Sequence, residues 1–306
     1  MPGSPRLARA SLLVALFALA SPPAPDAPLP QQAALVAKAL TETDADLRTA
    51  IARWTPKSAP APRDVVLYAL YEQRLYRRLA RDTRLAAATL PTLTPALRAA
   101  TRDLLVAHRE LYRLTPPLPA RATVKVGNAA PAATLLAYYR EADRRFRVPW
   151  DVLASVNFVE SKFGKLRNAS ASGAQGPMQF LPATWARYGL GGNVHDAHDA
   201  ILGAAHYLHA SGAPRSMRRA LHAYNPSPAY VDAVLRYAKQ KSISLLRWIY
   251  YAPTVPCLGR KRATAERFLH PLGHASERPV GRPRVGWLYN TRQQGTRQQG
   301  RSEGAR

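Results

Sequence analysis

A glutamate near the end of an apolar segment is the side chain best placed for acid–base chemistry. Val152, Val156, Val159 and Phe163 recur at the spacing of one helix face, and Glu160 lies beside them. A carboxyl group among apolar side chains is expensive to ionise, so its pKa rises and it can act as a general acid near neutral pH. Glu160 is therefore the candidate catalytic acid, and the alternative is a solvated glutamate at a helix end.

The residues on either side of this glutamate predict a helix and then a loop. Pro149 is expected in the first turn of the helix, where a proline is tolerated because its missing N–H would be unpaired. After Glu160 the sequence is rich in small residues, and Gly173 and Gly176 are positions at which backbone could approach a ligand. A second short helix is expected to begin at Pro182.

Two histidine pairs have the spacing of metal ligands. They are His195-x-x-His198, which has aspartates beside it, and His206-x-x-His209. No motif with matching partners and no cysteine ligand accompanies them. We therefore expect neither a metal nor another cofactor.

Helices must position these side chains, because strand-like alternation is nearly absent from the sequence. Apolar residues at helical spacing predict helices at 34–54, from 65 onward, around 97–111 and at 133–145. Beyond Pro182, helices are expected after a cap at Asp196 or Asp199, then at 217–224 and at 230–237. The expected fold class is all-α.

The composition describes a strongly basic chain. Among 306 residues, 44 Lys and Arg stand against 19 Asp and Glu, which gives a formal net charge of +25. Such a chain is attracted to polyanions, but no nucleic-acid motif accompanies the charge, so no specific nucleic-acid binding is expected. From Arg236 to the last residue, 15 Lys and Arg against 3 Glu contribute +12 of this total. Cys257 is the only cysteine, which excludes an intramolecular disulfide.

The first twenty residues have the layout of a signal peptide. Arg6 and Arg9 precede an apolar run at 10–20, which is short for a membrane span and ends in a small-x-small pattern before Ser21. We expect export, and a mature chain without a transmembrane segment. The alternative is an uncleaved N-terminus that anchors the protein to the membrane.

The rest of the chain divides by composition. Residues 21–30 are a Pro-rich linker, 31–115 a helical region of unknown function, and 116–131 a second linker. Residues 132–240 carry the candidate catalytic residues. Residues 241–306 form a basic tail whose composition predicts disorder.

Four blocks of sequence, taken in order, resemble the lytic transglycosylase domain. They are Glu160-Ser161; Ser170-x-x-Gly173-Ala174-x-Gly176-Pro177-Met178-Gln179-Phe180-x-Pro182-x-Thr184-Trp185; residues 193–208; and Ala223-Tyr224-Asn225. The resemblance covers roughly 133–239, and the Gly-Pro-Met-Gln-Phe form is similar to actinobacterial members in particular. It implies a lysozyme-like, mostly helical catalytic domain at 132–240 that cleaves peptidoglycan glycan strands. A secreted or cell-wall-associated monomer is then expected.

The resemblance also implies catalysis by one carboxylate. Most glycosidases use two, whereas Glu160 has no second acid nearby in sequence. In the family's reaction the glutamate protonates the oxygen of the MurNAc–GlcNAc β-1,4 bond. The carboxylate then takes the proton of the muramic acid C6 hydroxyl, which closes on C1 to give a 1,6-anhydro product.

Four further residues match family positions at the substrate. Ser170 and Gln179 correspond to residues that line the cleft and hydrogen-bond near the reacting sugar, and Tyr224 and Asn225 to the Tyr-Asn pair that faces the glutamate. Each has a structural alternative: a turn for Ser170, loop bracing for Gln179, packing for Tyr224 and a turn for Asn225. The spacing from Glu160 to Ser170 is one residue longer than in the commonest family form, so Ser170 departs from the family pattern.

Two other functions remain open. A goose-type-lysozyme-like hydrolase would release reducing-end products instead of anhydro sugars. A non-catalytic basic protein on a degenerate scaffold would bind wall polymer or nucleic acid. The basic tail is a candidate electrostatic tether to anionic wall polymers or phospholipid head groups, and an incidental tail is the alternative.

Overall fold

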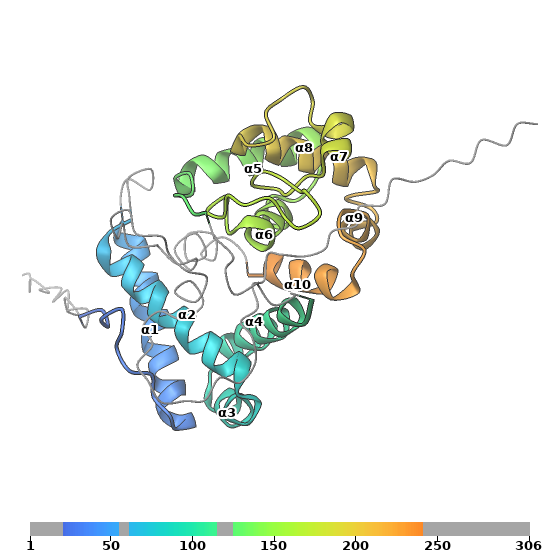
Figure 1. The fold of residues 1–306 in the computed structure, drawn as a ribbon. Helices are drawn as coiled ribbons and strands as arrows, with labels where there is room; N and C mark the ends of the chain where they lie inside the picture. The colour runs from blue at the N-terminus through green and yellow to red at the C-terminus, as the bar shows by residue number, and fades with distance from the viewer. Residues whose placement is uncertain (1–20, 55–60, 115–124, 241–306) are drawn as a thin grey trace, which may run out of the picture.

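The computed structural model describes residues 21–54, 61–114 and 125–240, which form a set of helices (Figure 1). The helices are α1 (Ala33–Arg53), α2 (Arg63–Arg81), α3 (Thr83–Thr89), the 3₁₀ helix η1 (Leu90–Thr92), α4 (Pro95–Leu114), α5 (Ala132–Phe146), α6 (Trp150–Ser161), α7 (Pro182–Tyr188), α8 (Ala197–Ala210), α9 (Met217–Tyr224) and α10 (Pro228–Ala238). Isolated bridges are the β-structure of the described residues. The expected all-α class is confirmed. The predicted signal peptide, most of the second linker and the basic tail lie outside the described residues.

The predicted helices are present, with differences at short elements and ends. Helix α3 was missed because seven residues are too few to show a period; its start is marked instead by Asp82, whose side chain accepts a hydrogen bond from Leu85 N at 2.9 Å. Pro149 is the N-cap of α6 and not a residue of its first turn. The helix ends at Ser161, so Phe163 lies beyond it, although its side chain is buried as expected.

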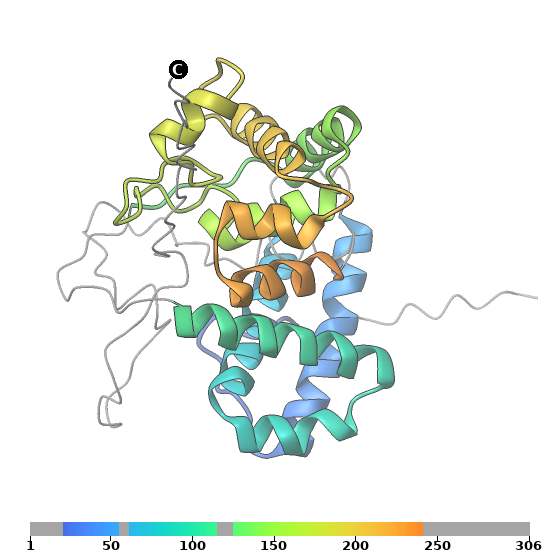
Figure 2. The ribbon, with the colours of Figure 1, turned by 90° about the vertical axis from the view of Figure 1, so that its right-hand side faces the viewer.

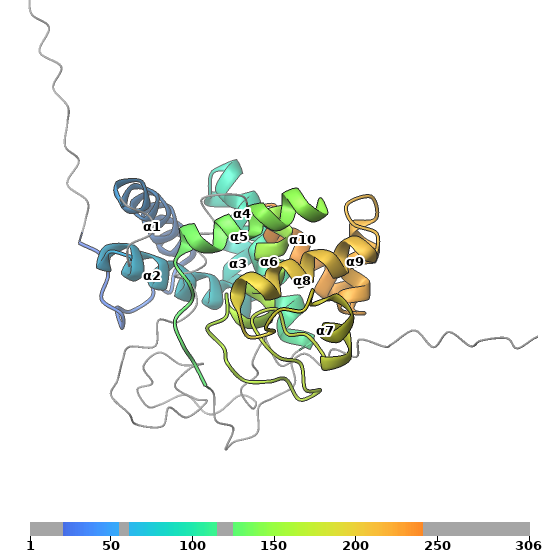
Figure 3. The same ribbon diagram turned by 90° about the horizontal axis from the view of Figure 1, so that it is seen from above.

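Helix α6 is the centre of the second half of the molecule. Helices α5 and α8 pack over it and α10 packs against it from the other side (Figures 1 and 3). All residues from Val152 to Ser161 are buried. A helix enclosed in this way has no solvated face, so a charged residue on it must find its partners inside the protein.

Helices α1 to α4 form the first half and share a core with the second. Helix α1 packs on α2 and α3, α2 packs on α4, and α4 lies alongside α10 (Figures 1 and 2). The buried apolar side chains run without interruption from α1 to α10. Among the described residues, no helix is both long enough and apolar enough to span a membrane.

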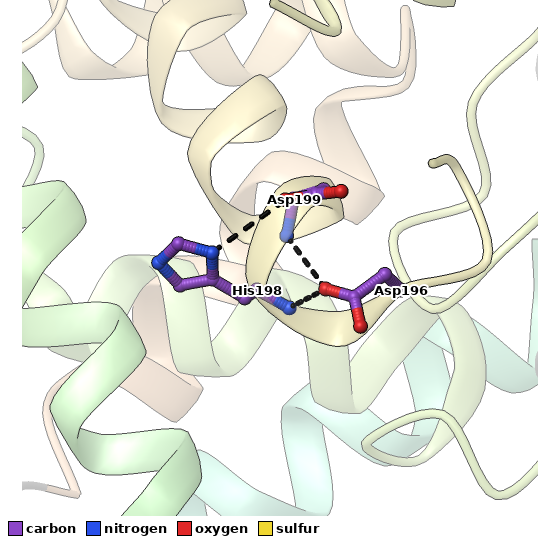
Figure 4. Close-up of side chains that lie close together, drawn as sticks. All are labelled: Asp196, His198 and Asp199. Atoms are coloured by element: carbon purple, nitrogen blue, oxygen red, sulfur yellow. Dashed lines mark hydrogen bonds and ion pairs between the residues drawn. The ribbon is translucent and has the colours of Figure 1, made fainter. Parts of the chain in front are cut away.

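Of the two aspartates expected to cap α8, Asp196 does so (Figure 4). Asp196 is the N-cap, and its Oδ1 accepts hydrogen bonds from His198 N at 2.8 Å and Asp199 N at 3.0 Å. The ring of His198 bonds Glu141 of α5 through Nε2 at 2.9 Å and lies 3.5 Å from Asp199 through Nδ1. Possible ligand atoms of Asp196, His198 and Asp199 lie within 4.8 Å of one another, but they already serve the cap and the link to α5. The absence of a metal site stays a prediction.

The link between His198 and Glu141 should stabilise the fold more at low pH than at high pH. The hydrogen bond to Glu141 raises the pKa of His198, so its contribution is complete below about pH 6.5 and is lost as the pH rises through the raised value. We expect Glu141→Gln to lower the free energy of unfolding by about 0.5 kcal/mol at pH 5.5 and by less at pH 8.5. Chemical denaturation at both pH values measures this, with His195→Gln as the control. An equal loss at both pH values would contradict the prediction.

Candidate active site

Glu160 lies in the last turn of α6, with 2% of its surface exposed. One carboxyl oxygen, Oε1, accepts a hydrogen bond from the hydroxyl of Tyr230 in α10 at 2.7 Å. No hydrogen bond from the described residues occupies the other oxygen, Oε2. Oε2 is therefore the carboxyl oxygen that no described residue occupies.

Burial sets the protonation of this carboxyl. Loss of solvation raises the pKa of Glu160 to about 7, while the hydrogen bond from Tyr230 and the positive charge of Lys162 act in the opposite direction. The carboxyl terminus of α6 also disfavours a negative charge in its last turn. Near neutral pH both the acid and the carboxylate are accessible, as a general acid–base group requires.

The backbone turns sharply after α6. Lys162, Phe163 and Gly164 have φ values of 55°, 62° and 76°, and the first two are in the left-handed region that non-glycine residues rarely adopt. The Lys162 ammonium donates to the carbonyl oxygens of Phe158 at 2.9 Å and Val159 at 3.4 Å, and lies 4.4 Å from the Phe158 ring centroid. These bonds satisfy the last carbonyls of α6 and hold a cation close to Glu160.

Ser161 ties the following loop to α6. Its buried hydroxyl donates to the carbonyl oxygen of Pro177 and accepts from Gly164 N at 2.7 Å. Tyr224 of α9 is fully buried and donates from its hydroxyl to the next carbonyl, Met178 O, at 2.6 Å. Two successive carbonyls of the loop are thus bound by side chains from two different helices.

Gln179 lies directly after these two carbonyls and is strained. Its φ is 50° and only 4% of its surface is exposed. Its side-chain nitrogen donates to Gly176 O at 3.0 Å and Asn168 O at 3.4 Å, which is the loop-bracing role left open by the sequence. Its oxygen Oε1 is buried and accepts no hydrogen bond from the described residues. An unmet acceptor of this kind could receive a donor from a ligand.

Ser170 closes a tight turn. Its hydroxyl accepts from Ala174 N at 3.0 Å and lies 2.9 Å from the Ser172 hydroxyl, and its backbone pairs with Ala174. The geometry is that of the turn residue named as an alternative. A direct contact of Ser170 with substrate stays a prediction.

The Tyr-Asn pair lies at the end of α9. Tyr224 is near enough to Glu160 for the carboxylate to add to the effect of burial in raising the Tyr224 pKa. Its hydroxyl, however, is used on the loop backbone, as the packing alternative requires. Asn225 is the C-cap of α9, is 5% exposed, and accepts from Ser227 N through its backbone carbonyl at 2.7 Å. The contacts of both residues with substrate stay predictions.

The two glycines of the loop differ in what they require. A side chain at Gly176 would place its Cβ 1.8 Å from Val194 O, and φ is +76°, so this glycine is needed for packing within the chain. This contact, and not the expected approach of a ligand, explains why position 176 requires glycine. Gly173 has a φ of +83°, and no atom lies within 4 Å of the position that a Cβ would occupy there.

The structure adds Tyr230 and Ser161 to the residues chosen from the sequence. Tyr230 was expected only as part of a helix. A tyrosine at a buried helical position needs a partner for its hydroxyl, but nothing in the sequence identifies a glutamate 70 residues away as that partner. Ser161 was quoted only as part of a motif, and its two bonds depend on where the loop returns.

Other aspartates do not supply a second carboxylate at Glu160. Asp196 caps α8, Asp199 accepts from Asn193 N at 2.9 Å, and Asp232 pairs with Arg218 at 2.7 Å. These are the cap and surface roles expected from the sequence. Within the described residues, the charged group that acts on the pKa of Glu160 is the cation of Lys162.

The raised pKa of Glu160 predicts that neutralising it stabilises the protein at high pH. A carboxyl whose pKa is raised in the folded state favours folding while it is protonated. Its contribution to the free energy of unfolding is complete below its unfolded pKa of about 4.5 and is lost as the pH rises through about 7. The Glu160→Gln variant and the native protein should therefore have equal free energies of unfolding near pH 4. At pH 8.5 the free energy of unfolding of the variant should be higher by about 3 kcal/mol. Denaturation curves between pH 4 and 9 test this, with exposed Glu42→Gln as the control. A difference that does not change with pH would rule out a buried protonated carboxyl.

Removal of the Ser161 hydroxyl should loosen the loop. Ser161→Ala leaves the Gly164 amide without its acceptor in a buried position, which should cost about 1–3 kcal/mol of unfolding free energy. Ser155→Ala is the matched control, because the Ser155 hydroxyl only donates to Asp151 O within α6. The two variants are compared by chemical denaturation, and equal losses would show that Ser161 has no special part in holding the loop.

Comparison with protein families accounts for this arrangement. Residues 137–246 match the family model described as the Transglycosylase SLT domain. The match begins within α5 and includes Glu160, the strained loop and α10. Comparison with curated proteins and with solved structures gave no significant match. Residues 137–246 are thus similar to the Transglycosylase SLT domain, and those of them that the structure describes have the expected all-α, lysozyme-like fold.

Proposed function

We propose that the protein is an exported lytic transglycosylase that cleaves the MurNAc–GlcNAc β-1,4 bonds of peptidoglycan. The observation that carries the proposal is the buried Glu160, whose pKa is raised to about 7 and whose Oε1 accepts a hydrogen bond from Tyr230. The SLT match supports the substrate class. Export rests on the signal-peptide layout of residues 1–20, which lie outside the described residues.

The proposed reaction returns Glu160 to its starting state. Oε2–H protonates the glycosidic oxygen, the bond from that oxygen to C1 breaks, and the departing sugar gains a hydroxyl. The resulting carboxylate takes the proton of the C6 hydroxyl as that oxygen bonds to C1, which forms the 1,6-anhydro ring. No water is consumed, so no second carboxylate is needed to activate one.

Other parts of the proposal concern binding. We propose that the buried oxygen of Gln179 accepts a hydrogen bond from the sugar or its N-acetyl group, since this acceptor is unmet within the described residues. Ser170, Tyr224 and Asn225 are proposed to shape the same site. The basic tail at 241–306 is a proposed tether to anionic wall polymers, and the monomeric state, the wall location and the likeness to actinobacterial members stay predictions.

Digestion of purified peptidoglycan tests the reaction. Mass spectrometry should show anhydromuropeptides, which are lighter than the reducing-end products by one water. Loss of the general acid in Glu160→Gln should lower their rate of release about a thousandfold. Asp232→Asn is a matched control, because Asp232 pairs with Arg218 at the surface.

The same digestion separates the alternatives. Reducing-end products that disappear with Glu160→Gln would show a goose-type-lysozyme-like hydrolase. No products of either kind, together with retained binding to wall polymer or nucleic acid, would show a non-catalytic binding protein.

A further inference from the structure

Helix α10, which carries Tyr230, is enclosed by the two halves of the molecule. It packs against α6 on one side and α4 on the other, and Figure 2 shows it between the two. Its buried residues lie within about half of its circumference: Tyr230, Val231, Ala233, Val234, Tyr237 and Ala238. A helix of 11 residues is not stable by itself in water. Its position therefore depends on what packs on both sides.

The side of α10 that faces α6 makes the contacts of the active site. Tyr230 donates to Glu160 at 2.7 Å, and the ring of Tyr237 meets that of Phe158 edge-on, with centroids 5.1 Å apart. A tyrosine hydroxyl is carried on a stiff ring far from the backbone, so a small tilt of α10 moves it by a similar distance. Hydrogen bonds weaken quickly beyond about 3.2 Å.

The other side of α10 is fixed by α4. Arg236 forms a hydrogen-bonded ion pair with Asp103 of α4. Ala107 lies one turn further along α4 on the same face as Asp103 and is fully buried. A small side chain at this position allows the two helices to approach closely.

Helix α4 is in turn held by the rest of the first half. The guanidinium of Arg109 donates to Ala80 O at 3.0 Å and Leu79 O at 3.1 Å, the last carbonyls of α2. Helix α2 packs on α1. A continuous series of contacts thus leads from α1 through α2, α4 and α10 to the carboxyl of Glu160.

We propose that helix α4 serves as a brace for the active site, in which Asp103 and Ala107 are positioning residues that hold the Tyr230 hydroxyl on Glu160. This gives the helical region at 31–115 a role in the chemistry of the neighbouring domain. The proposal rests on the proposed function, but its central claim, the dependence of the Tyr230–Glu160 bond on α4, can be measured without substrate.

The titration of Glu160 reports on this bond. The groups that face the carboxyl are Tyr230 from α10, Lys162 from the end of α6 and Tyr224 from α9. Loss of the Tyr230 bond removes an effect that lowers the pKa, so Tyr230→Phe should raise the pH at which Glu160 titrates by about one unit. The titration is read from the pH dependence of the difference in unfolding free energy between each variant and the same variant carrying Glu160→Gln.

Ala107→Leu should reproduce this shift, because the added methyl groups push α10 away from α4. Ala50→Leu is the matched control: Ala50 is 2% exposed in α1, which packs on α2 and α3 but not on α10. Ala50→Leu should lower the free energy of unfolding by a similar amount without changing the pH at which Glu160 titrates. Asp103→Ala, which removes only the ion pair, should give a smaller shift in the same direction and remains testable if Ala107→Leu does not fold.

A double variant identifies the route. Lys162 also interacts electrostatically with groups of the first half, namely Arg77 of α2 and His108 of α4, so a change in α4 has a second route to Glu160 through Lys162. If Ala107→Leu acts through Tyr230, it should cause no further shift in the presence of Tyr230→Phe, whereas additive shifts would overturn the proposal. The proposal would also be overturned if neither α4 variant changed the pH at which Glu160 titrates, or if Ala50→Leu shifted that pH as much as Ala107→Leu does.

Activity provides a second, separate readout. Tyr230→Phe and Ala107→Leu should lower the rate of anhydromuropeptide release by similar factors, of about tenfold or more, and Ala50→Leu should not. If the native protein releases no product, the proposed function fails, while the titration still decides whether the brace exists.

Discussion

The structure depends on keeping one carboxyl group dry and yet able to exchange a proton. An unpaired carboxylate would be too costly in this position, and a direct ion pair would hold the group permanently ionised. Tyr230 instead supplies a neutral hydrogen-bond donor to Glu160 Oε1. The positive charge of Lys162 acts on the carboxyl while its ammonium bonds the carbonyls of α6. The enclosure of α6 by α5, α8 and α10 follows from the same requirement.

A strained loop is held next to this carboxyl by contacts from several directions. Ser161 binds Pro177 O, Tyr224 binds Met178 O, and Gly176 packs against the Val194 backbone. The residue that follows, Gln179, keeps a positive φ and an unmet buried oxygen. A conformation that costs about 1–3 kcal/mol persists only where its surroundings determine it fully. The motif residues of the loop therefore act first on one another, and through that on the shape of the site.

The sequence predicted the fold class, most helices and the burial of Glu160, because these depend on local periodicity. It failed where a feature depends on chain segments that meet only in three dimensions. Tyr230 reaches Glu160 across 70 residues, and Gly176 is required by Val194, which no spacing rule relates to it. The hydroxyls of Ser170 and Tyr224 bond backbone atoms of this loop that no sequence pattern identified, while their contact with a sugar stays a prediction. The short helix α3 lacked the length to show a period.

A single carboxyl that serves as acid and then as base needs a pKa between the extremes that paired carboxylates adopt. In two-carboxylate enzymes, different surroundings push the two pKa values apart, so that each group has one task. Burial alone would raise the pKa of Glu160 too far. The carboxylate would then accept a proton readily, but the acid would donate its proton poorly. Tyr230 and Lys162 oppose burial and leave the pKa at about 7. On the proposed mechanism, the balance between burial and these two groups does the work of a second carboxylate. The placement of Tyr230, and with it the packing of α10, is then part of the catalytic apparatus.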